Sequence, residues 1–314
     1  MPETSRIEHQ ASSFRLLAWW QLLRIGNVFT AITNILAGFL LVQKEWQPLG
    51  SLFLLIGSST LLYAAGMVLN DAFDAALDAK KRPERPIPSG RISRATAFQT
   101  GFSLLILGIA LACLVSWQLQ SYASAMVAVL LALAVIAYDA KLKQTELGPS
   151  AMGVCRYLNI LLGASVAGDL WLEPAAWIYA AAVGMYTIGL TLFARSENES
   201  SKTRGQAIGG LVTLASMMLV SILPLTLSRF QTAQFPTIWY GSLLLLCLLV
   251  VGSHQKTQQN PGPDSFRRHV SKLLIGFIFL DALACSAAMG WSAGLIAFTL
   301  VIPTTIISRW APMT

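Results

Sequence analysis

The sequence has few charged residues for its length. Only 12% of its 314 residues are Asp, Glu, Lys or Arg, whereas 55% are hydrophobic and the mean hydropathy is +0.60. A soluble domain of this size could not bury so much apolar surface while exposing so little charge. The scarcity of charge therefore excludes an ordinary soluble protein and indicates a membrane protein.

Histidine and cysteine are scarce as well. The three histidines are scattered along the sequence, and the four cysteines include no CxxC pair. We therefore expect no histidine metal site, and we interpret the cysteines as packing residues. The sequence contains no Ser/His/Asp or Cys/His arrangement of the kind used in nucleophilic catalysis either.

Apolar runs are abundant, and several approach the ~20 residues needed to cross a bilayer. They predict an all-α, polytopic membrane protein with nine or ten transmembrane helices, in one domain over residues 1–314. Three of the ten runs (the fourth, eighth and tenth) are short. The predicted spans are residues 21–42, 51–69, 97–117, 122–137, 150–167, 174–193, 206–227, 237–251, 270–289 and 293–307.

The basic residues are distributed unevenly over these spans. With ten spans, 20 of the 22 Lys and Arg residues fall on one side, and only Lys44 and Arg229 fall on the other. The positive-inside rule then predicts that the basic side and both termini are cytoplasmic. The net charge of +7 follows from this topology, and no nucleic-acid partner is expected.

The densest charge lies between the second and third spans, in "NDAFDAALDAKKRPERPIPSGRIS" (residues 70–93). Asp71, Asp74 and Asp78 are spaced i, i+3 and i+7, which places them on one face of a helix that continues the second span. Three neighbouring carboxylates repel one another unless a cation lies among them, and they suit Mg²⁺ that bridges to substrate phosphates. The alternative is a solvated helix end, although acidic residues there oppose the helix dipole.

The rest of this stretch predicts a loop with a fixed path. Pro83, Pro86 and Pro88 exclude a continued helix, Gly90 allows a sharp turn, and Ser93 is a candidate N-cap for the third span. Basic residues place hydrogen-bond donors beside the carboxylates: Lys80, Lys81, Arg82, Arg85 and Arg91. Carboxylates, a metal ion and basic donors together indicate a diphosphate site. The alternative for any single basic residue is that it only anchors the topology.

The stretch closely resembles the first aspartate-rich motif of the UbiA superfamily of intramembrane prenyltransferases, NDxxDxxxD followed by RPxRPIPSGxIS. Arg24 and Asn27 are similar to the family's early R-x-x-N, and "YDAKLKQTELGP" from Tyr138 is similar to its tyrosine-plus-lysine segment. The resemblance implies a helical bundle around a central cavity that opens to the cytoplasm and to lipid. It also implies Mg²⁺-dependent transfer of an isoprenoid from its diphosphate to an aromatic or lipid acceptor.

The family's second motif, a DxxxDxxxG-like pattern after the sixth span, is altered here. In "ARSENESSKTRG", Glu197 and Ser201 occupy the two aspartate positions, and Glu199 lies between them. Glutamate can still bind a metal, but a serine hydroxyl is a weak, neutral ligand. Three possibilities stay open: the first motif holds the metal, Glu199 substitutes, or catalysis is impaired. A divergent subgroup, such as the UbiA-like proteins of ebo-type gene clusters, also stays open.

The resemblance and the polar residues within spans together give candidate roles, since such residues are costly in a membrane. Asp71, Asp74 and Lys141 are the candidate catalytic residues, and Asp71, Asp74, Asp78, Glu197 and Glu199 are the candidate Mg²⁺ ligands. We assign Lys141 and Arg156 to diphosphate oxygens and Asn159 to the cavity lining. Further substrate-binding candidates are Arg24, Asn27, Asn70, Arg82, Arg85, Tyr138 and Lys143.

Several questions stay open from the sequence. Lys141 and Lys143 compete for one role, because Leu142 stands four residues after Tyr138. Asp281 in the ninth span either forms a structural hydrogen bond or has a function. A noncatalytic family member that binds or moves lipid is one alternative to an enzyme. A secondary transporter is another, although its charges would lie near the middle of the membrane rather than in loops.

Overall fold

The structure is a computed structural model, and it describes residues 18–168, 174–196, 202–227, 236–260 and 262–307. The long secondary-structure elements in these ranges are all α-helices. They are α2 (Val28–Gln43), α3 (Leu49–Lys81), α4 (Arg94–Leu119), α5 (Ala123–Ala140), α6 (Gly148–Ala164), α7 (Pro174–Arg195), α8 (Lys202–Val220), α9 (Pro236–Gln259), α10 (Pro263–Met289), α11 (Trp291–Thr299) and α12 (Val301–Ile307). The predicted all-α class is confirmed.

The number of membrane-spanning helices also agrees with the prediction. Within the described residues, nine helices are long and apolar enough to cross a membrane, and a shorter apolar segment follows at Trp291–Ile307. That segment is divided into α11 and α12. Apolar side chains also cover the outside of the bundle, where Phe53, Ile106 and Met218 are 67%, 67% and 75% exposed. This is the surface that a multi-pass membrane protein presents to lipid.

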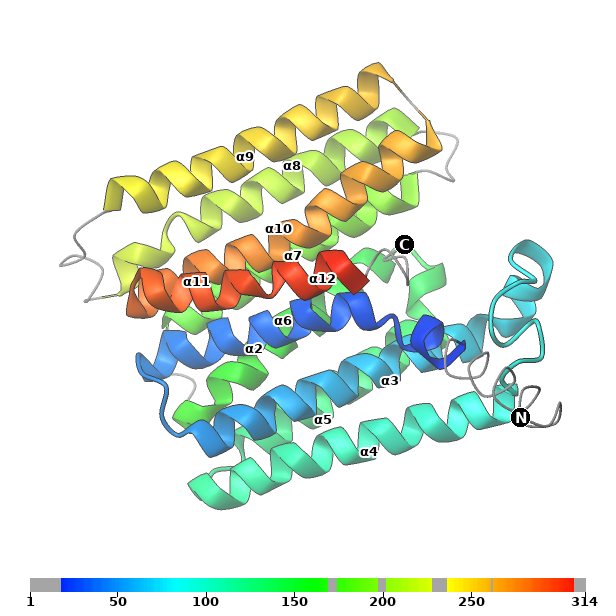
Figure 1. The fold of residues 1–314 in the computed structure, drawn as a ribbon, viewed down its shortest axis with the longest axis horizontal. Helices are drawn as coiled ribbons and strands as arrows, with labels where there is room; N and C mark the ends of the chain where they lie inside the picture. The colour runs from blue at the N-terminus through cyan, green and yellow to red at the C-terminus, as the bar shows by residue number, and fades with distance from the viewer. Residues whose placement is uncertain (1–17, 169–173, 197–201, 228–235, 261, 308–314) are drawn as a thin grey trace, which may run out of the picture.

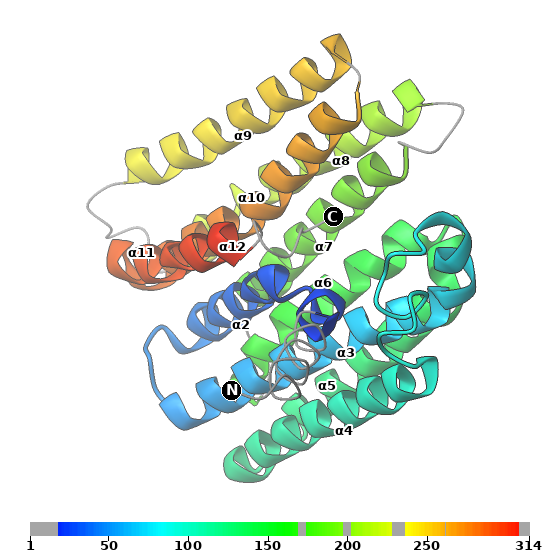
Figure 2. The same cartoon turned by 45° about the vertical axis from the view of Figure 1, so that its right-hand side comes forward.

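Helix α2 lies at the centre of the bundle. It packs against α3, α6, α7 and α10, and the helical span Ala18–Gln43 that contains it is 83% buried, against 28% for the α4 span. Figures 1 and 2 show α2 and α6 between a group formed by α3, α4 and α5 and a second group formed by α7 to α10. The polar residues of α2 and α6 therefore face the interior of the protein.

Helices α2 and α6 approach each other closely because glycine lies at their contact. A Cβ atom on Gly163 would lie 2.5 Å from the backbone oxygen of Ile35, and one on Gly38 would overlap the backbone oxygen of Ile160. Small residues allow such close approach of helix backbones in membranes, where packing rather than the hydrophobic effect drives association.

The loop between α3 and α4 is a packed element. Ile87 and Ile92 are buried in a cluster with Leu22 and Val68, so the loop is fixed against the N-terminal helix and α3. Gly90 has a φ of +75°, and the Ser93 side chain accepts a hydrogen bond from the Thr96 backbone N–H, which confirms the predicted turn and N-cap. The prolines and the buried isoleucines together fix the position of the basic residues between them.

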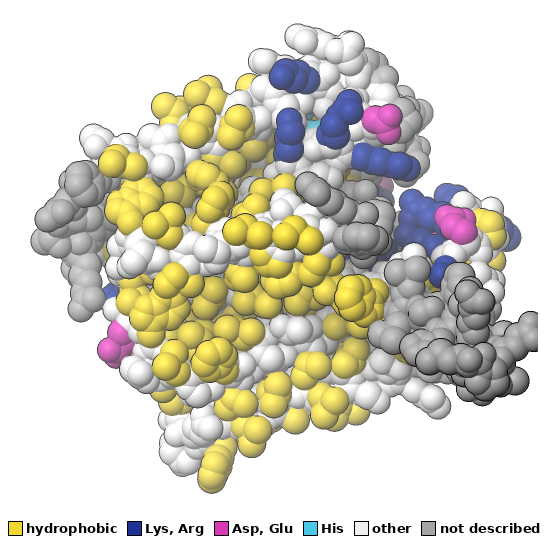
Figure 3. Space-filling view, in the orientation of Figure 1, with side chains coloured by type: hydrophobic (Ala, Val, Ile, Leu, Met, Phe, Trp, Pro, Cys, Tyr) yellow, Lys and Arg dark blue, Asp and Glu magenta, His cyan; other side chains and the backbone are white. Residues whose placement is uncertain are grey.

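Lys and Arg residues gather at the end of the bundle where α3 ends. Figure 3 shows them around the α3–α4 loop and at the nearby ends of α9 and α10, while a wide band of hydrophobic side chains covers the helices beside it. Among the described residues, Lys44 lies at the opposite end, between α2 and α3. The basic residues that the sequence analysis assigned to one side of the membrane therefore gather at one end of the folded bundle.

Candidate active site

The acidic motif lies on the last turns of α3. The helix continues without a break from the second predicted span to Lys81, as the sequence predicted. Asp71 and Asp78 are each 6% exposed, and the Asp74 side chain is 19% exposed. Buried carboxylates need compensating partners, because desolvation of an unpaired charge costs several kcal/mol.

Basic side chains from three separate segments supply those partners. Arg85 Nη1, in the α3–α4 loop, lies 3.3 Å from an Asp71 oxygen and 2.8 Å from an Asp78 oxygen. Arg24 Nη2 lies 3.5 Å from the same Asp71 oxygen. We call these three aspartates and Arg24, Arg85 and Lys143 the charged rim.

Lys143 completes the charged rim from the loop between α5 and α6. Its Nζ lies 2.9 Å from Asp74 Oδ1 and donates to the Asn70 side-chain oxygen at 3.0 Å. Arg195, at the end of α7, donates to the backbone oxygen of Thr145 at 2.7 Å and so fixes the loop that carries Lys143. Arg195 was not among the residues selected from the sequence, because nothing in its local pattern indicates this positioning role.

A cavity of about 330 Å³ opens beside the charged rim. Its walls come from α2, α3, α5, α6, α7 and α10 and are largely apolar, with residues such as Leu62, Leu131, Val135, Leu190 and Phe277. Arg24, Tyr138 and Asp139 line it near the charged rim, since they lie at the ends of their helices nearest to Asp71 and Lys143. A largely apolar cavity with polar groups at one end suits a ligand that has an apolar chain and a charged head.

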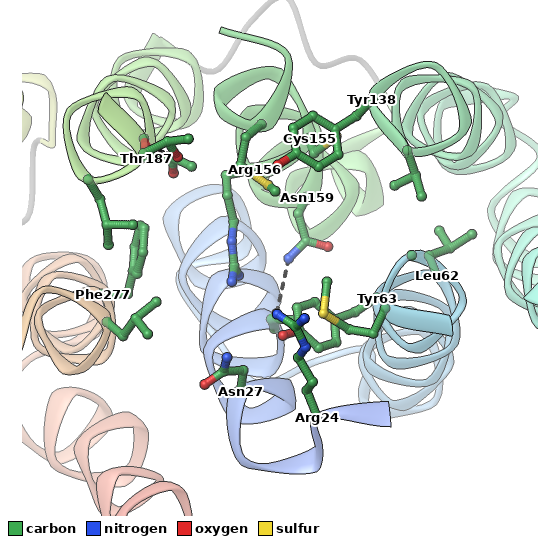
Figure 4. A pocket seen from close by; sticks show the side chains of 18 of the residues that line it. Arg24, Asn27, Leu62, Tyr63, Tyr138, Cys155, Arg156, Asn159, Thr187 and Phe277 are labelled. Atoms are coloured by element: carbon green, nitrogen blue, oxygen red, sulfur yellow. Dashed lines mark hydrogen bonds between the residues drawn. The ribbon is translucent and has the colours of Figure 1, made fainter. Parts of the chain in front are cut away.

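A second polar layer crosses the deeper part of the cavity. Figure 4 shows Arg24, Tyr63 of α3, and Arg156 and Asn159 of α6 directed toward one another. Arg156 donates to Thr30 Oγ1 at 2.8 Å and to Asn34 Oδ1 at 3.1 Å. Asn159 donates to the Ala31 backbone oxygen at 3.1 Å and accepts from the Ser59 hydroxyl at 2.7 Å.

Asp281 lies next to this layer and is held by hydrogen bonds from neighbouring helices. It is fully buried and accepts hydrogen bonds from Thr33, Asn34 and Tyr179, at 2.5, 2.8 and 2.6 Å. Asn34 also accepts from Arg156, so Asp281 and Arg156 share one partner. The structure therefore favours the structural interpretation of Asp281, which joins α10 to α2 and α7 and supports the cavity lining.

The structure brings most of the predicted site residues together, but not all of them. Arg24, Asn27, Tyr138, Arg156 and Asn159 line the cavity, and Asn70, Arg85 and Lys143 contact one another or the acidic motif. Arg82 is exposed at the C-cap of α3, with no side-chain contact to the acidic motif within the described ranges. Glu197 and Glu199 lie outside the described residues.

The geometry also distinguishes the two competing lysines. Lys141 is exposed at the C-terminal cap of α5, whereas the Lys143 side chain is only 9% exposed and contacts Asp74. The assignment of Lys141 to diphosphate oxygens is therefore not supported by its position. Lys141 caps α5, whereas Lys143 lies in the 3₁₀ turn Leu142–Gln144 that follows, so the two side chains have different surroundings.

The donor set for a metal ion is incomplete within the described part of the chain. There, no three His, Cys, Asp or Glu side chains converge in an arrangement that could hold a metal ion. The carboxylates of the acidic motif form ion pairs with Arg24, Arg85 and Lys143. Mg²⁺, however, is commonly held by one or two protein carboxylates together with waters and substrate phosphates. Asp74 fits that requirement, being the most exposed of the three aspartates.

The histidines are closer together than the sequence suggested. The rings of His254 and His269 lie 5.6 Å apart beside Phe193, at the ends of α9 and α10. His269 is buried, and its Nδ1 shares a hydrogen bond with the Ser253 hydroxyl at 2.9 Å. These two histidines lie apart in the sequence and side by side in the fold, because α9 and α10 pack against each other.

Comparisons with known proteins identify a family and relatives that this chain resembles. The model of the UbiA prenyltransferase family matches residues 31–273. Digeranylgeranylglyceryl phosphate synthase of Saccharolobus solfataricus is 30% identical over 209 residues, which cover 65% of this chain and 69% of that protein. The enzyme of the same name from Methanoregula boonei is 30% identical over 240 residues, covering 71% and 81%.

A solved structure has the same fold. It is that of a UbiA homologue from Archaeoglobus fulgidus bound to GPP and Mg²⁺, with a TM-score of 0.63 and 15% sequence identity. The similarity covers 90% of this chain and 99% of that one. At this low identity the likeness extends to the arrangement of the helices.

Proposed function

Because this chain belongs to the UbiA prenyltransferase family, we propose that it transfers an isoprenoid group from a prenyl diphosphate to a hydrophobic acceptor in the cavity beside the charged rim. One observation carries the proposed use of the site. Arg24, Arg85 and Lys143 converge on the acidic motif, and Arg24 also lines the largely apolar cavity beside it. A diphosphate held at the charged rim would allow its isoprenoid chain to extend between the helices.

The proposed role of the basic residues is to bind the leaving diphosphate. Arg24 donates to Asp71 and has further N–H groups for phosphate oxygens. The three N–H groups of Lys143 already have acceptors in Asp74 and the two oxygens of Asn70, so Lys143 would exchange one of these partners for a phosphate oxygen. Charge-assisted hydrogen bonds of this kind strengthen as negative charge develops on the leaving group, which lowers the barrier. Mg²⁺, when held by Asp74 and the diphosphate, would supply further positive charge at the same place.

The proposed reaction needs no covalent intermediate with the protein. The C–O bond at the allylic carbon breaks, and its electron pair leaves with the diphosphate. The acceptor hydroxyl oxygen then forms a new C–O bond to that carbon and loses its proton, which the released diphosphate can take up. The apolar walls exclude water from the carbocation until the acceptor attacks.

The acceptor is proposed from the relatives. The two archaeal relatives are named for a product that carries geranylgeranyl groups on a glyceryl phosphate. Their names favour a lipid alcohol over an aromatic acceptor for this chain. An acceptor of this kind could reach the cavity from the surrounding bilayer, since the outer surface of the bundle is apolar.

The test of the proposed function is diphosphate release. The purified protein is incubated with geranyl, farnesyl or geranylgeranyl diphosphate, Mg²⁺ and a lipid extract that contains candidate acceptors. We expect release that depends on both Mg²⁺ and acceptor, and its loss in Asp74→Ala and Asp71→Ala variants that remain folded. A noncatalytic, lipid-binding protein would release no diphosphate from any of the three donors.

A further inference from the structure

Asp139 is a buried carboxylate that the roles assigned so far do not use. It lies near the end of α5, is only 2% exposed and lines the cavity. Its Oδ2 atom is buried and has no hydrogen-bond partner within the described part of the chain. An unsatisfied buried polar atom is rare in a folded protein and calls for a ligand, an ion or a water.

The charges around the cavity mouth leave Asp139 without a cation of its own. The described residues there provide four carboxylates, those of Asp71, Asp74, Asp78 and Asp139, against the three cations of the charged rim. Arg24, Arg85 and Lys143 all pair with the α3 aspartates, and no described side chain forms an ion pair with Asp139. Asp139 therefore has no basic partner of its own among the described side chains.

Asp139 lies on α5, which packs against α3, the helix that carries the acidic motif. The charges of Lys143, Asp74 and Asp71 all act on its carboxyl, and Lys143 directly contacts Asp74. Asp139 also lies at the negative end of the α5 dipole, which further disfavours an unpaired carboxylate. A donor diphosphate would add more negative charge, so its binding beside Asp139 requires a cation between them.

The chemistry of this arrangement identifies the missing partner. A diphosphate offers only acceptor oxygens and cannot satisfy a carboxylate directly, whereas a divalent cation binds both groups. Mg²⁺ prefers hard oxygen ligands and usually combines one or two carboxylates with substrate phosphates and waters. The altered second motif strengthens the case, because Ser201 stands where the family pattern has an aspartate.

We propose that Asp139 is a ligand of the Mg²⁺ that holds the donor diphosphate, and that it acts from α5 together with Asp74 on α3. It supplies a carboxylate that the second motif has lost at Ser201. This inference rests on the proposed function, since it concerns the same diphosphate site. The family resemblance assigned roles to Tyr138 and to the lysine of this segment, and none to Asp139.

The test measures binding of inorganic diphosphate to the full-length, purified protein as a function of Mg²⁺ concentration. Inorganic diphosphate is used because its binding does not depend on isoprenoid length. The variant is Asp139→Asn, which keeps the shape and removes the charge. The matched control is Asp264→Asn, which changes an exposed aspartate at the start of α10, away from the cavity.

The proposal predicts opposite effects with and without metal. In Asp139→Asn, the Mg²⁺ concentration for half-maximal diphosphate binding should rise by about 10-fold or more, since loss of even an outer-sphere partner of a metal costs that much. In excess EDTA, the same variant should bind diphosphate as well as the wild type or better, because a repelling charge is gone. Asp264→Asn should match the wild type in both conditions.

Each other outcome contradicts the proposal in a recognisable way. Superimposable Mg²⁺ curves for wild type and Asp139→Asn would mean that Asp139 is not a ligand. Weaker binding both with Mg²⁺ and in EDTA would mean that Asp139 only supports the structure. If the wild type binds no diphosphate at any Mg²⁺ concentration, the proposed function fails together with this inference.

Discussion

Lys143 is the residue whose surroundings argue most clearly for contact with the leaving group. Its ammonium group is shielded from solvent, contacts Asp74 and is fixed by the Asn70 side chain. Lys141, two residues earlier, has an exposed side chain and lies at the helix cap. The two lysines therefore form a matched pair for mutation.

We predict that Lys143→Ala weakens diphosphate binding and that Lys141→Ala does not. A hydrogen bond to a charged group is worth roughly 1.5–3 kcal/mol, which corresponds to about a tenfold to hundredfold loss of affinity. Titration of each variant with inorganic diphosphate at saturating Mg²⁺ measures this loss. Equal losses in the two variants would show that the lysines act only through the overall charge of the surface.

Asp281 belongs to the support of the cavity, and its predicted effect is on stability. Asp281→Ala removes the acceptor for Thr33, Asn34 and Tyr179 and leaves buried donors unsatisfied. Each unsatisfied donor costs about 1–3 kcal/mol, so the variant should unfold at a clearly lower temperature than the wild type in detergent. An unchanged melting temperature combined with lost activity would instead assign Asp281 a chemical role.

Helix α6 matters as an element because it carries Arg156 and Asn159 into the cavity from a close contact with α2. At Gly163 a side chain would collide with the α2 backbone near Ile35. We predict that Gly163→Val destabilises the protein by roughly 1–3 kcal/mol, as overpacking does, and lowers the yield of folded protein. Gly241→Ala is the control, since a Cβ at Gly241 meets nothing within 4 Å. Normal folding of Gly163→Val would mean that the two helices can separate without cost.

At the scale of elements, the sequence predicted the helices well and their ends less well. The i, i+3, i+7 spacing of Asp71, Asp74 and Asp78 predicted an extension of the second helix, and α3 continues to Lys81. The eighth predicted span ended at residue 251, whereas α9 continues to Gln259. Hydropathy reports where a helix leaves the apolar layer, and backbone hydrogen bonding continues beyond that point.

The side-chain contacts of the site could be predicted only in part. The motif spacing identified Asp71, Asp74 and Arg85 as neighbours, because they are close in sequence. The contacts of Arg156 with Asn34 and of Lys143 with Asn70 join residues 122 and 73 positions apart. Hydropathy and local spacing carry no information about which helix faces which, so these partners required the folded structure.

The whole molecule has a charge asymmetry that predicts its orientation in the membrane. We expect the end with the α3–α4 loop to face the cytoplasm, because Lys and Arg residues gather there. In a cysteine-free background, Lys141→Cys should react with a membrane-impermeant thiol reagent only in opened cells, and Lys44→Cys in intact ones. The reverse pattern of labelling would invert the proposed topology.

We propose that the charged rim holds the diphosphate while the cavity holds the isoprenoid chain. This proposal predicts that the two regions control different properties of the enzyme. Leu131 lines the part of the cavity away from the rim and is buried. Leu131→Phe shortens that space, whereas Lys143→Ala leaves it unchanged.

The most direct measurement is kcat/KM for geranyl, farnesyl and geranylgeranyl diphosphate in the wild type and in these two variants. We predict that Leu131→Phe lowers kcat/KM more strongly as the isoprenoid lengthens, while Lys143→Ala lowers it by a similar factor for all three donors. If the three kcat/KM values of Leu131→Phe keep the order and the ratios of the wild type, the isoprenoid chain lies outside this cavity and the proposed division between rim and cavity is wrong.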